Sequence, residues 1–157
     1  MADKNHTYAA FVEWTGGADG PAKTYKGYSR DHLIKMDGKP DLLGSSDPGF
    51  RGDASRHNPE DLMVASLSAC HMLWYLHLCT VNGIEVHAYE DKASGTMEET
   101  PDGGGRFTGV TLNPVVRMAP AGQRELAASL HKEAHKKCFI ANSVNFPVSH
   151  RPTIDTV

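Results

Sequence analysis

The sequence predicts an α+β fold, because β-rich segments stand on both sides of one long apolar helical segment. The chain has 157 residues, of which 39% are hydrophobic and 22% charged, which suits one domain over residues 1–157 with its own core. The predicted order is three strands, a helix, two strands, a second helix and a final strand, without the strand–helix alternation of a parallel α/β fold.

Charge and composition exclude several classes of function. The net charge is −3 and the pI is about 6.3, so the chain offers no basic field for nucleic acid. The start, MADKNHTY, has no apolar core typical of a signal peptide. Residues 62–81 are long enough to cross a membrane, but their serines and histidines favour the central helix of a soluble domain. We expect a cytoplasmic protein, in which three cysteines stay reduced.

The first part of the chain is predicted to be mostly strand. Residues 7–16 are β-rich and end at the turn signal GGADG. Residues 23–40 carry tyrosines and branched residues between glycine and proline, which indicates two strands with a bend. Residues 40–57 form a long loop rich in glycine, serine and proline, and loops of this length are often functional.

The central helix has clear start and stop signals. Asn58 is a favourable N-cap and Pro59 suits the first helical position, while Gly83 suits the position just past the end. The helix is apolar around most of its circumference, so it must be covered on nearly all sides. A chain of this size can hardly do that alone, which suggests a partner subunit.

The remainder reads as a hairpin, a helix and a last strand. Residues 83–99 alternate as a strand does, and residues 100–107 form a hairpin turn. Residues 107–118 are the returning strand, in which Pro114 indicates a sheet edge or bulge. Residues 120–138 form an amphipathic helix, and residues 147–157 form the final strand.

The cysteines are the first candidates for chemistry. Cys70 in mid-helix is either an inert core residue or a nucleophile whose pKa is lowered by an external cation. Cys138 is either a core thiol at the end of the second helix or the resolving partner of Cys70. Cys79 lies on the opposite side of the helix, roughly 13 Å from Cys70 along its axis. That is too far for a disulfide, so Cys79 is predicted to be structural.

Other polar residues raise narrower questions. Glu60 lies about 15 Å along the helix from Cys70, so it is either a simple first-turn carboxylate or part of a site built across two subunits. His131 and His135 have a spacing that can bind zinc, but their helix is expected to be exposed there and no HExxH pattern is present. We therefore expect no metal and no cofactor. No hydrolase GxSxG motif occurs either.

Two motifs together resemble a known family. NPEDLMVASLSACHM, residues 58–72, and KKCFIANSVNFPV, residues 136–148, are similar to the two cysteine segments of the OsmC/Ohr proteins, the osmotically inducible and organic hydroperoxide resistance proteins. The resemblance implies an OsmC-like fold. In that fold, antiparallel sheets wrap around two long central helices in an intertwined homodimer.

The resemblance also implies a thiol peroxidase that reduces organic hydroperoxides. Cys70 would be the peroxidatic cysteine and Cys138 the resolving one, with a thiol or lipoyl-type dithiol as reductant. Glu60 would hold an arginine that activates the thiolate in a site built from both chains. Because Ala18 stands where the Ohr branch has its arginine, the OsmC branch is favoured, with Arg51 as the choice and Arg56 as the alternative.

The residues leave two other readings open. One is a cysteine-based redox sensor or small-molecule-binding dimer that shares the thiols but does not turn over. The other is a structural dimer whose cysteines are inert. If the chain is a peroxidase, Met72, Leu73 and Phe139 are expected to provide apolar walls for the substrate.

Overall fold

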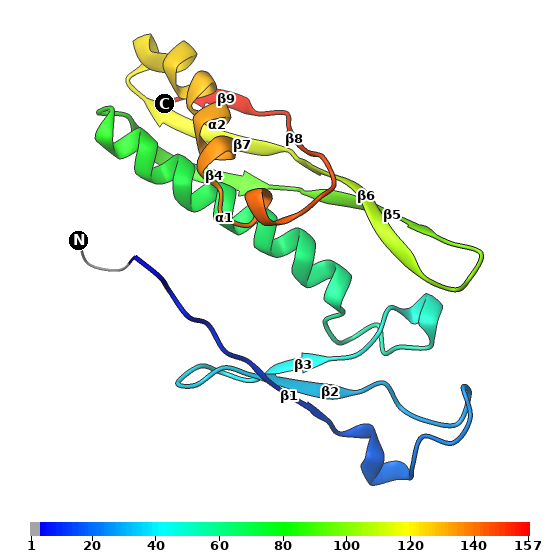
Figure 1. The fold of residues 1–157 in the computed structure, drawn as a ribbon. Helices are drawn as coiled ribbons and strands as arrows, with labels where there is room; N and C mark the ends of the chain where they lie inside the picture. The colour runs from blue at the N-terminus through cyan, green and yellow to red at the C-terminus, as the bar shows by residue number, and fades with distance from the viewer. Residues whose placement is uncertain (1–3) are drawn as a thin grey trace. The chain divides into compact units, whose positions relative to one another are not determined.

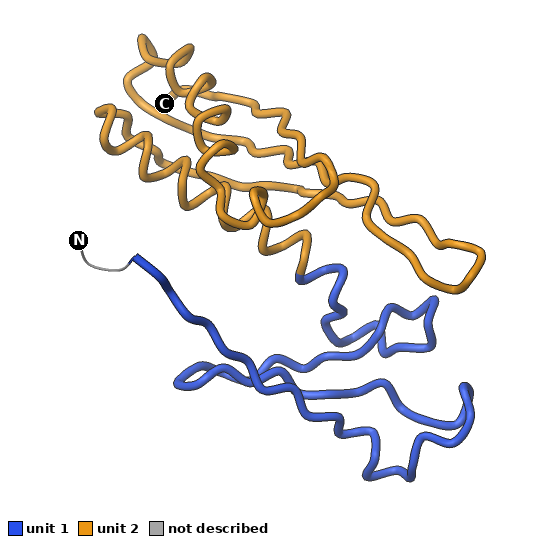
Figure 2. The backbone as a smooth tube through the Cα atoms, in the orientation of Figure 1, with its two compact units in different colours: residues 1–62 blue, residues 63–157 orange. Residues whose placement is uncertain are grey.

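The computed structural model describes residues 4–157, which form two compact units that divide between residues 62 and 63 (Figures 1 and 2). Within the described residues there are two α-helices and three small three-stranded sheets, so the predicted α+β class is confirmed. Helix α1 begins in the first unit and runs through the second. The prediction of one domain stays a prediction. Short 3-10 helices punctuate the loops at η1 Gly16–Asp19, η2 Pro48–Phe50, η3 Ala121–Gln123 and η4 Ala141–Ser143.

Residues 1–62 contain one antiparallel sheet in the order β1-β2-β3. Val12 of β1 lies opposite Ile34 of β2, and Leu33 of β2 lies opposite Leu43 of β3. The strands are short: β1 Phe11–Trp14, β2 His32–Lys35 and β3 Leu42–Gly44.

Two expectations for this unit are wrong. Residues 23–40 hold one strand instead of two, because turns occupy the first half of that segment. There Arg30 donates hydrogen bonds to the carbonyls of Tyr25 and Tyr28 and lies over both rings, an arrangement that ties the backbone into a curl. The third strand, β3, lies inside the segment predicted to be all loop, where Ser45 and His57 add further backbone hydrogen bonds.

Helix α1, Pro59–Val81, has 23 residues and the predicted ends. The Asn58 Oδ1 accepts a hydrogen bond from the Asp61 N–H at 2.8 Å, as an N-cap does. At the other end Gly83 has φ +71°, and the Ile84 N–H donates to the Cys79 carbonyl at 2.9 Å. This is a Schellman end, which needs a left-handed residue that glycine adopts without strain.

One stripe of α1 is buried, and its residues are four apart: Leu67, His71, Tyr75 and Cys79. The rest of this apolar helix is half-buried or exposed. By length and composition α1 is the one helix among the described residues that could cross a membrane, a test that the core helix of a soluble protein also passes.

Residues 63–157 contain two mixed sheets, in the orders β4-β7-β9 and β5-β6-β8. The pairs β4–β7 and β5–β6 are antiparallel, whereas β6–β8 and β7–β9 are parallel. The prediction of purely antiparallel sheets is therefore wrong. Helix α2 carries the chain back so that the last strands run beside β6 and β7 in the same direction. The strands are β4 Glu85–Asp91, β5 Ser94–Glu99, β6 Gly105–Leu112, β7 Pro114–Ala119, β8 Val148–His150 and β9 Thr153–Thr156.

Each of the three strands predicted for this unit is divided into two in the structure. The three breaks lie beside one another, at the boundary between the two sheets. At this boundary the Asp91 carboxylate accepts hydrogen bonds from the Ser68 hydroxyl and the Asn113 N–H, at 2.5 and 2.6 Å. Asn113 also donates through Nδ2 to the Lys92 carbonyl at 2.9 Å. Pro114, with no N–H to donate, begins β7. The predicted hairpin turn at residues 100–107 is confirmed, with Gly103 at φ +85°.

Helix α2, Arg124–Lys137, packs its apolar face on the core of this unit. The main cluster joins α1, α2, β7 and β9, and a smaller one joins α1 to β6. Strand β7 alternates with period two: Val116 is fully buried, while its neighbour Val115 is 36% exposed. The buried residues of the main cluster are Tyr75, Cys79, Ile84, Val116, Met118, Ala127, Leu130, Ala134 and Ile154.

This alternation gives a matched pair of stability variants. Val116→Ala removes two buried carbon atoms and leaves a small cavity, so it should lower the free energy of unfolding by about 2 kcal/mol. Val115→Ala should change it by less than about 0.5 kcal/mol. Urea denaturation followed by circular dichroism measures both values. Equal effects of the two substitutions would mean that the register of β7 is wrong.

Candidate functional site

The two thiols singled out by the sequence meet in the second unit. Cys70 is half-buried in the middle of α1, and Cys138 is 1% exposed at the residue that caps the end of α2. Their side chains lie close enough for Cys70 to influence the pKa of Cys138, and both are free thiols. The Cys138 Sγ also accepts a hydrogen bond from the Ala141 N–H at 3.4 Å. The third cysteine, Cys79, is fully buried in the main cluster.

The protein environment makes the two thiols unequal. Burial raises the pKa of Cys138 to about 11, and its contact with Cys70 acts in the same direction, whereas the Ala141 N–H opposes it. Cys138 therefore keeps its proton at neutral pH. Burial also raises the pKa of Cys79. Cys70 is more exposed than Cys138.

An apolar hollow of about 320 Å³ lies along α1, lined by Leu73, Trp74 and His77. These residues follow Cys70 by three, four and seven positions, so they share its side of the helix. The Trp74 ring contacts both neighbours of Cys138. Phe139 meets it edge-on at a centroid distance of 5.6 Å, and the Lys137 Nζ lies 5.6 Å from its centroid. Of the expected walls, Leu73 lines the hollow and Phe139 packs against its tryptophan, whereas Met72 is not part of the lining.

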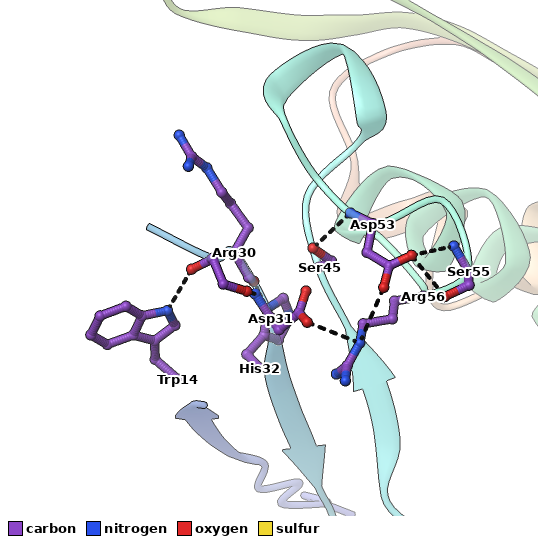
Figure 3. Close-up of polar contacts among 9 residues, drawn as sticks. Trp14, Arg30, Asp31, His32, Ser45, Asp53, Ser55 and Arg56 are labelled. Atoms are coloured by element: carbon purple, nitrogen blue, oxygen red, sulfur yellow. Dashed lines mark hydrogen bonds and ion pairs between the residues drawn. The ribbon is translucent and has the colours of Figure 1, made fainter. Parts of the chain in front are cut away.

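The candidate arginines lie in the first unit. Arg56 is held by two carboxylates: its Nε lies 3.4 Å from the Asp31 Oδ2 and 3.8 Å from the Asp53 Oδ2 (Figure 3). Asp53 is itself fixed, because its Oδ1 accepts hydrogen bonds from the N–H and the hydroxyl of Ser55 at 2.8 and 2.7 Å. Arg56 therefore has a structural role in closing the loop that precedes α1.

Arg51 has a different environment. Its φ is +67°, the left-handed region that a non-glycine residue rarely adopts. The loop around it is tightly closed. The Gly52 N–H donates to the Asp47 carbonyl at 3.0 Å, and a Cβ at Gly52 would collide with the Ser46 carbonyl oxygen. The Arg51 side chain is exposed and forms no ion pair within residues 4–157.

Glu60, the third predicted member, lies in the first turn of α1 and is half-buried. In the part of the chain that the structure describes, it forms no ion pair with Arg51 or Arg56. The structure thus brings Cys70 and Cys138 together and leaves Glu60 and the arginines as separate predictions.

One expectation about α2 is wrong. His131 was expected on an exposed surface, but it is fully buried, and its Nδ1 lies 2.9 Å from the Nε2 of His71. Sequence spacing could not reveal this, because it pairs residues on one helix and not across two. No group of three His, Cys, Asp or Glu side chains among residues 4–157 could hold a metal ion.

Comparison with known proteins adds the family. The model for OsmC-like proteins matches residues 52–152. An OsmC-like protein of unknown function from Vibrio cholerae is 32% identical, with a TM-score of 0.83 over 95% of this chain and 100% of that one. A search of curated proteins finds no match.

More distant structures share the fold alone. An organic hydroperoxide resistance protein OsmC from Legionella pneumophila is 19% identical, with a TM-score of 0.71 over 98% of this chain and 99% of that one. The organic hydroperoxide resistance protein OhrB of Bacillus subtilis is 23% identical, with a TM-score of 0.63 over 96% and 98%. The family model and the relative from Vibrio cholerae each span most of the sequence, so the chain belongs to the OsmC-like protein family.

Proposed function

We propose that this protein is a thiol peroxidase that reduces organic hydroperoxides to alcohols. The observation that supports this most directly is the proximity of a half-buried Cys70 thiol to a buried Cys138 thiol. Membership of a family that includes organic hydroperoxide resistance proteins supports the same chemistry.

The proposed cycle begins at Cys70. Its thiolate attacks the terminal oxygen of the hydroperoxide, the O–O bond breaks, and the alkoxide leaves as an alcohol after taking up a proton. Cys70 is then a sulfenic acid. The Cys138 sulfur attacks the Cys70 sulfur, losing its proton, and the hydroxyl leaves as water, so that a disulfide forms. An external thiol or lipoyl-type dithiol reduces the disulfide by exchange.

The inequality of the thiols suits these roles. A peroxidatic thiol has to meet substrate, whereas a resolving thiol has only to meet the sulfenic acid beside it. Because its pKa is about 11, Cys138 is a poor nucleophile toward peroxide in solution. The hollow formed by Leu73, Trp74 and His77 would accept the organic group of the substrate, so an alkyl or aryl hydroperoxide should react faster than hydrogen peroxide.

Activation of the Cys70 thiolate is assigned to Arg51 together with Glu60, as the family resemblance implies. Arg56 is already held by Asp31 and Asp53, so its guanidinium is less available. Arg51 has no such partners among the described residues and sits in a constrained loop. A guanidinium near the sulfur stabilises both the thiolate and the negative charge that develops on the leaving oxygen.

A second copy of the chain is proposed to cover α1. Within residues 4–157, α1 buries one stripe only, and Leu73 and Val81 are each 63% exposed. Exposed apolar surface on this scale marks an interaction face, and proteins of this family typically form homodimers. We therefore propose a homodimer in which the active site draws on both chains. We also propose that the protein acts in the cytoplasm, where a thiol reductant is available.

The peroxidase assignment can be tested by peptide mapping. Reduced protein mixed with one equivalent of cumene hydroperoxide should form a Cys70–Cys138 disulfide, because the two thiols already lie near each other. Cys138→Ser should accumulate a sulfenic acid on Cys70 that dimedone traps, and Cys70→Ser should not consume peroxide. Mass spectrometry reads each species. Absence of Cys70 oxidation, or slow and equal oxidation of Cys79, would reject the assignment and favour the binding or structural readings.

The two arginines form a matched pair for the activation step. Arg51→Ala should slow Cys70 oxidation by about 100-fold, the effect typical of removing one group that stabilises developing charge. Arg56→Ala should leave that rate nearly unchanged but lower stability by about 1 kcal/mol, since it breaks two partly exposed ion pairs. Stopped-flow measurement of peroxide consumption and urea denaturation separate the effects. The reverse pattern would transfer the activating role to Arg56.

The dimer is tested by two leucines that differ in position. Light scattering should give about twice the chain mass of 17.1 kDa for the unmodified protein. Leu73→Asp places a charge on the exposed face of α1 and should shift the mass to that of one chain. Leu126→Asp, on α2 and 39% exposed, should leave the dimer intact. A monomeric unmodified protein would contradict the proposal.

A further inference from the structure

A cluster of buried imidazoles lies between the helices that carry the two cysteines, and the proposed chemistry does not use it. His71 of α1 and His131 of α2 are both fully buried. The His71 Nε2 lies 2.9 Å from the His131 Nδ1, and the rings are nearly parallel, with 8° between their planes. The Tyr75 ring stacks on His131 at a centroid distance of 3.8 Å. His150 of β8 flanks the pair at 5.5 Å from His71.

Both imidazoles of the pair are neutral at physiological pH. Burial is the main reason that the pKa of His71 falls to about 4 and that of His131 to about 3, and the neighbouring histidines add to the effect. A neutral imidazole has one N–H and one lone pair, so two of them make one directional hydrogen bond. The outer nitrogens, the His71 Nδ1 and the His131 Nε2, have no hydrogen-bond partner among the described residues.

The hydrogen bond between His71 and His131 lies near both cysteines along their helices. His71 directly follows Cys70 on α1. Cys138 follows His131 by seven residues, which is about two turns of α2, so the two lie on the same side of that helix and both are buried. The bond is therefore the polar link between α1 and α2 that lies nearest to Cys70 along the chain. Ordinary apolar packing tolerates sliding between helices, whereas a buried directional hydrogen bond favours one register.

We propose that His71 and His131 are positioning residues that hold α1 and α2 in the register at which Cys138 reaches Cys70. The pair then decides the fate of the Cys70 sulfenic acid. With the register held, Cys138 captures it as a disulfide; with the register loosened, a second hydroperoxide molecule oxidises the sulfenic acid to sulfinic acid and is itself reduced to an alcohol. This inference rests on the proposed peroxidase function.

The test measures how the Cys70 sulfenic acid partitions between disulfide and sulfinic acid as cumene hydroperoxide is raised, read by mass spectrometry. His131→Leu should raise the sulfinic fraction at a given peroxide concentration at least tenfold. The double variant His71→Leu/His131→Leu should do the same, although it leaves no polar group unpaired, because it lacks the directional bond. His135→Leu is the matched control. It lies one turn further along α2, and its side chain forms no hydrogen bond within residues 4–157.

A conservative pair separates positioning from proton transfer. In His71→Gln/His131→Asn each amide reaches as far as the ring nitrogen that it replaces, and it can donate and accept without titrating between pH 4 and 9. This variant should return the partition to within about twofold of the unmodified protein, with the same pH profile between pH 6 and 8. A tenfold higher sulfinic fraction in this variant, with the fold intact by circular dichroism, would overturn the positioning role of the two histidines in favour of a titrating role.

Failure of the inference is distinguishable from failure of the peroxidase assignment. In a Cys138→Ser background, dimedone trapping reports formation of the Cys70 sulfenic acid alone. If that step is absent in every variant, the peroxidase assignment fails. If the sulfenic acid forms normally and His131→Leu still forms the disulfide as the unmodified protein does, the proposed positioning role of His71 and His131 is wrong. Where His131→Leu does not fold, His71→Gln/His131→Asn decides. A sulfinic fraction like that of the unmodified protein supports the positioning role, and a tenfold higher fraction overturns it.

Discussion

The packing of α2 against one stripe of α1 is the contact on which the thiol pair depends. The stripe repeats every four residues along α1, and its Tyr75 shares the main cluster with the small, fully buried Ala127 and Ala134 of α2. Small side chains leave room at a helix contact in which large rings can stack. The stacking of Tyr75 on His131 at 3.8 Å fills that space. The same contact brings Cys138, which caps the end of α2, to Cys70.

Burial has two opposite consequences in this contact. It shields Cys138 from solvent and raises the pKa of its thiol, which suits a group that acts only on a neighbouring sulfur. It also keeps His71 and His131 neutral, because a charged imidazole would lose its hydration without gaining an anionic partner. Cys70, half-buried beside an apolar hollow, is the member of the group that remains open to a reactant.

Much of the backbone could be predicted because its signals are local. The N-cap Asn58 and the left-handed Gly83 set the ends of α1 through bonds to residues within five positions. The hairpin turn at residues 100–107 likewise needs only its own glycines. The strand breaks could not be predicted, because Asp91 stops the strands through bonds to Ser68 and Asn113, more than twenty residues away.

The sequence by itself determined the class of fold, the ends of α1 and, through two motifs, the identity of the candidate thiols. Each of these depends on residues that are close in the chain. The tertiary structure decided the parallel pairing of β8 with β6 and of β9 with β7, the proximity of Cys138 to Cys70, and the burial of His131 against His71. These depend on which faces of separate elements meet, and the periodicity of one helix shows that it has a buried face without showing what covers it.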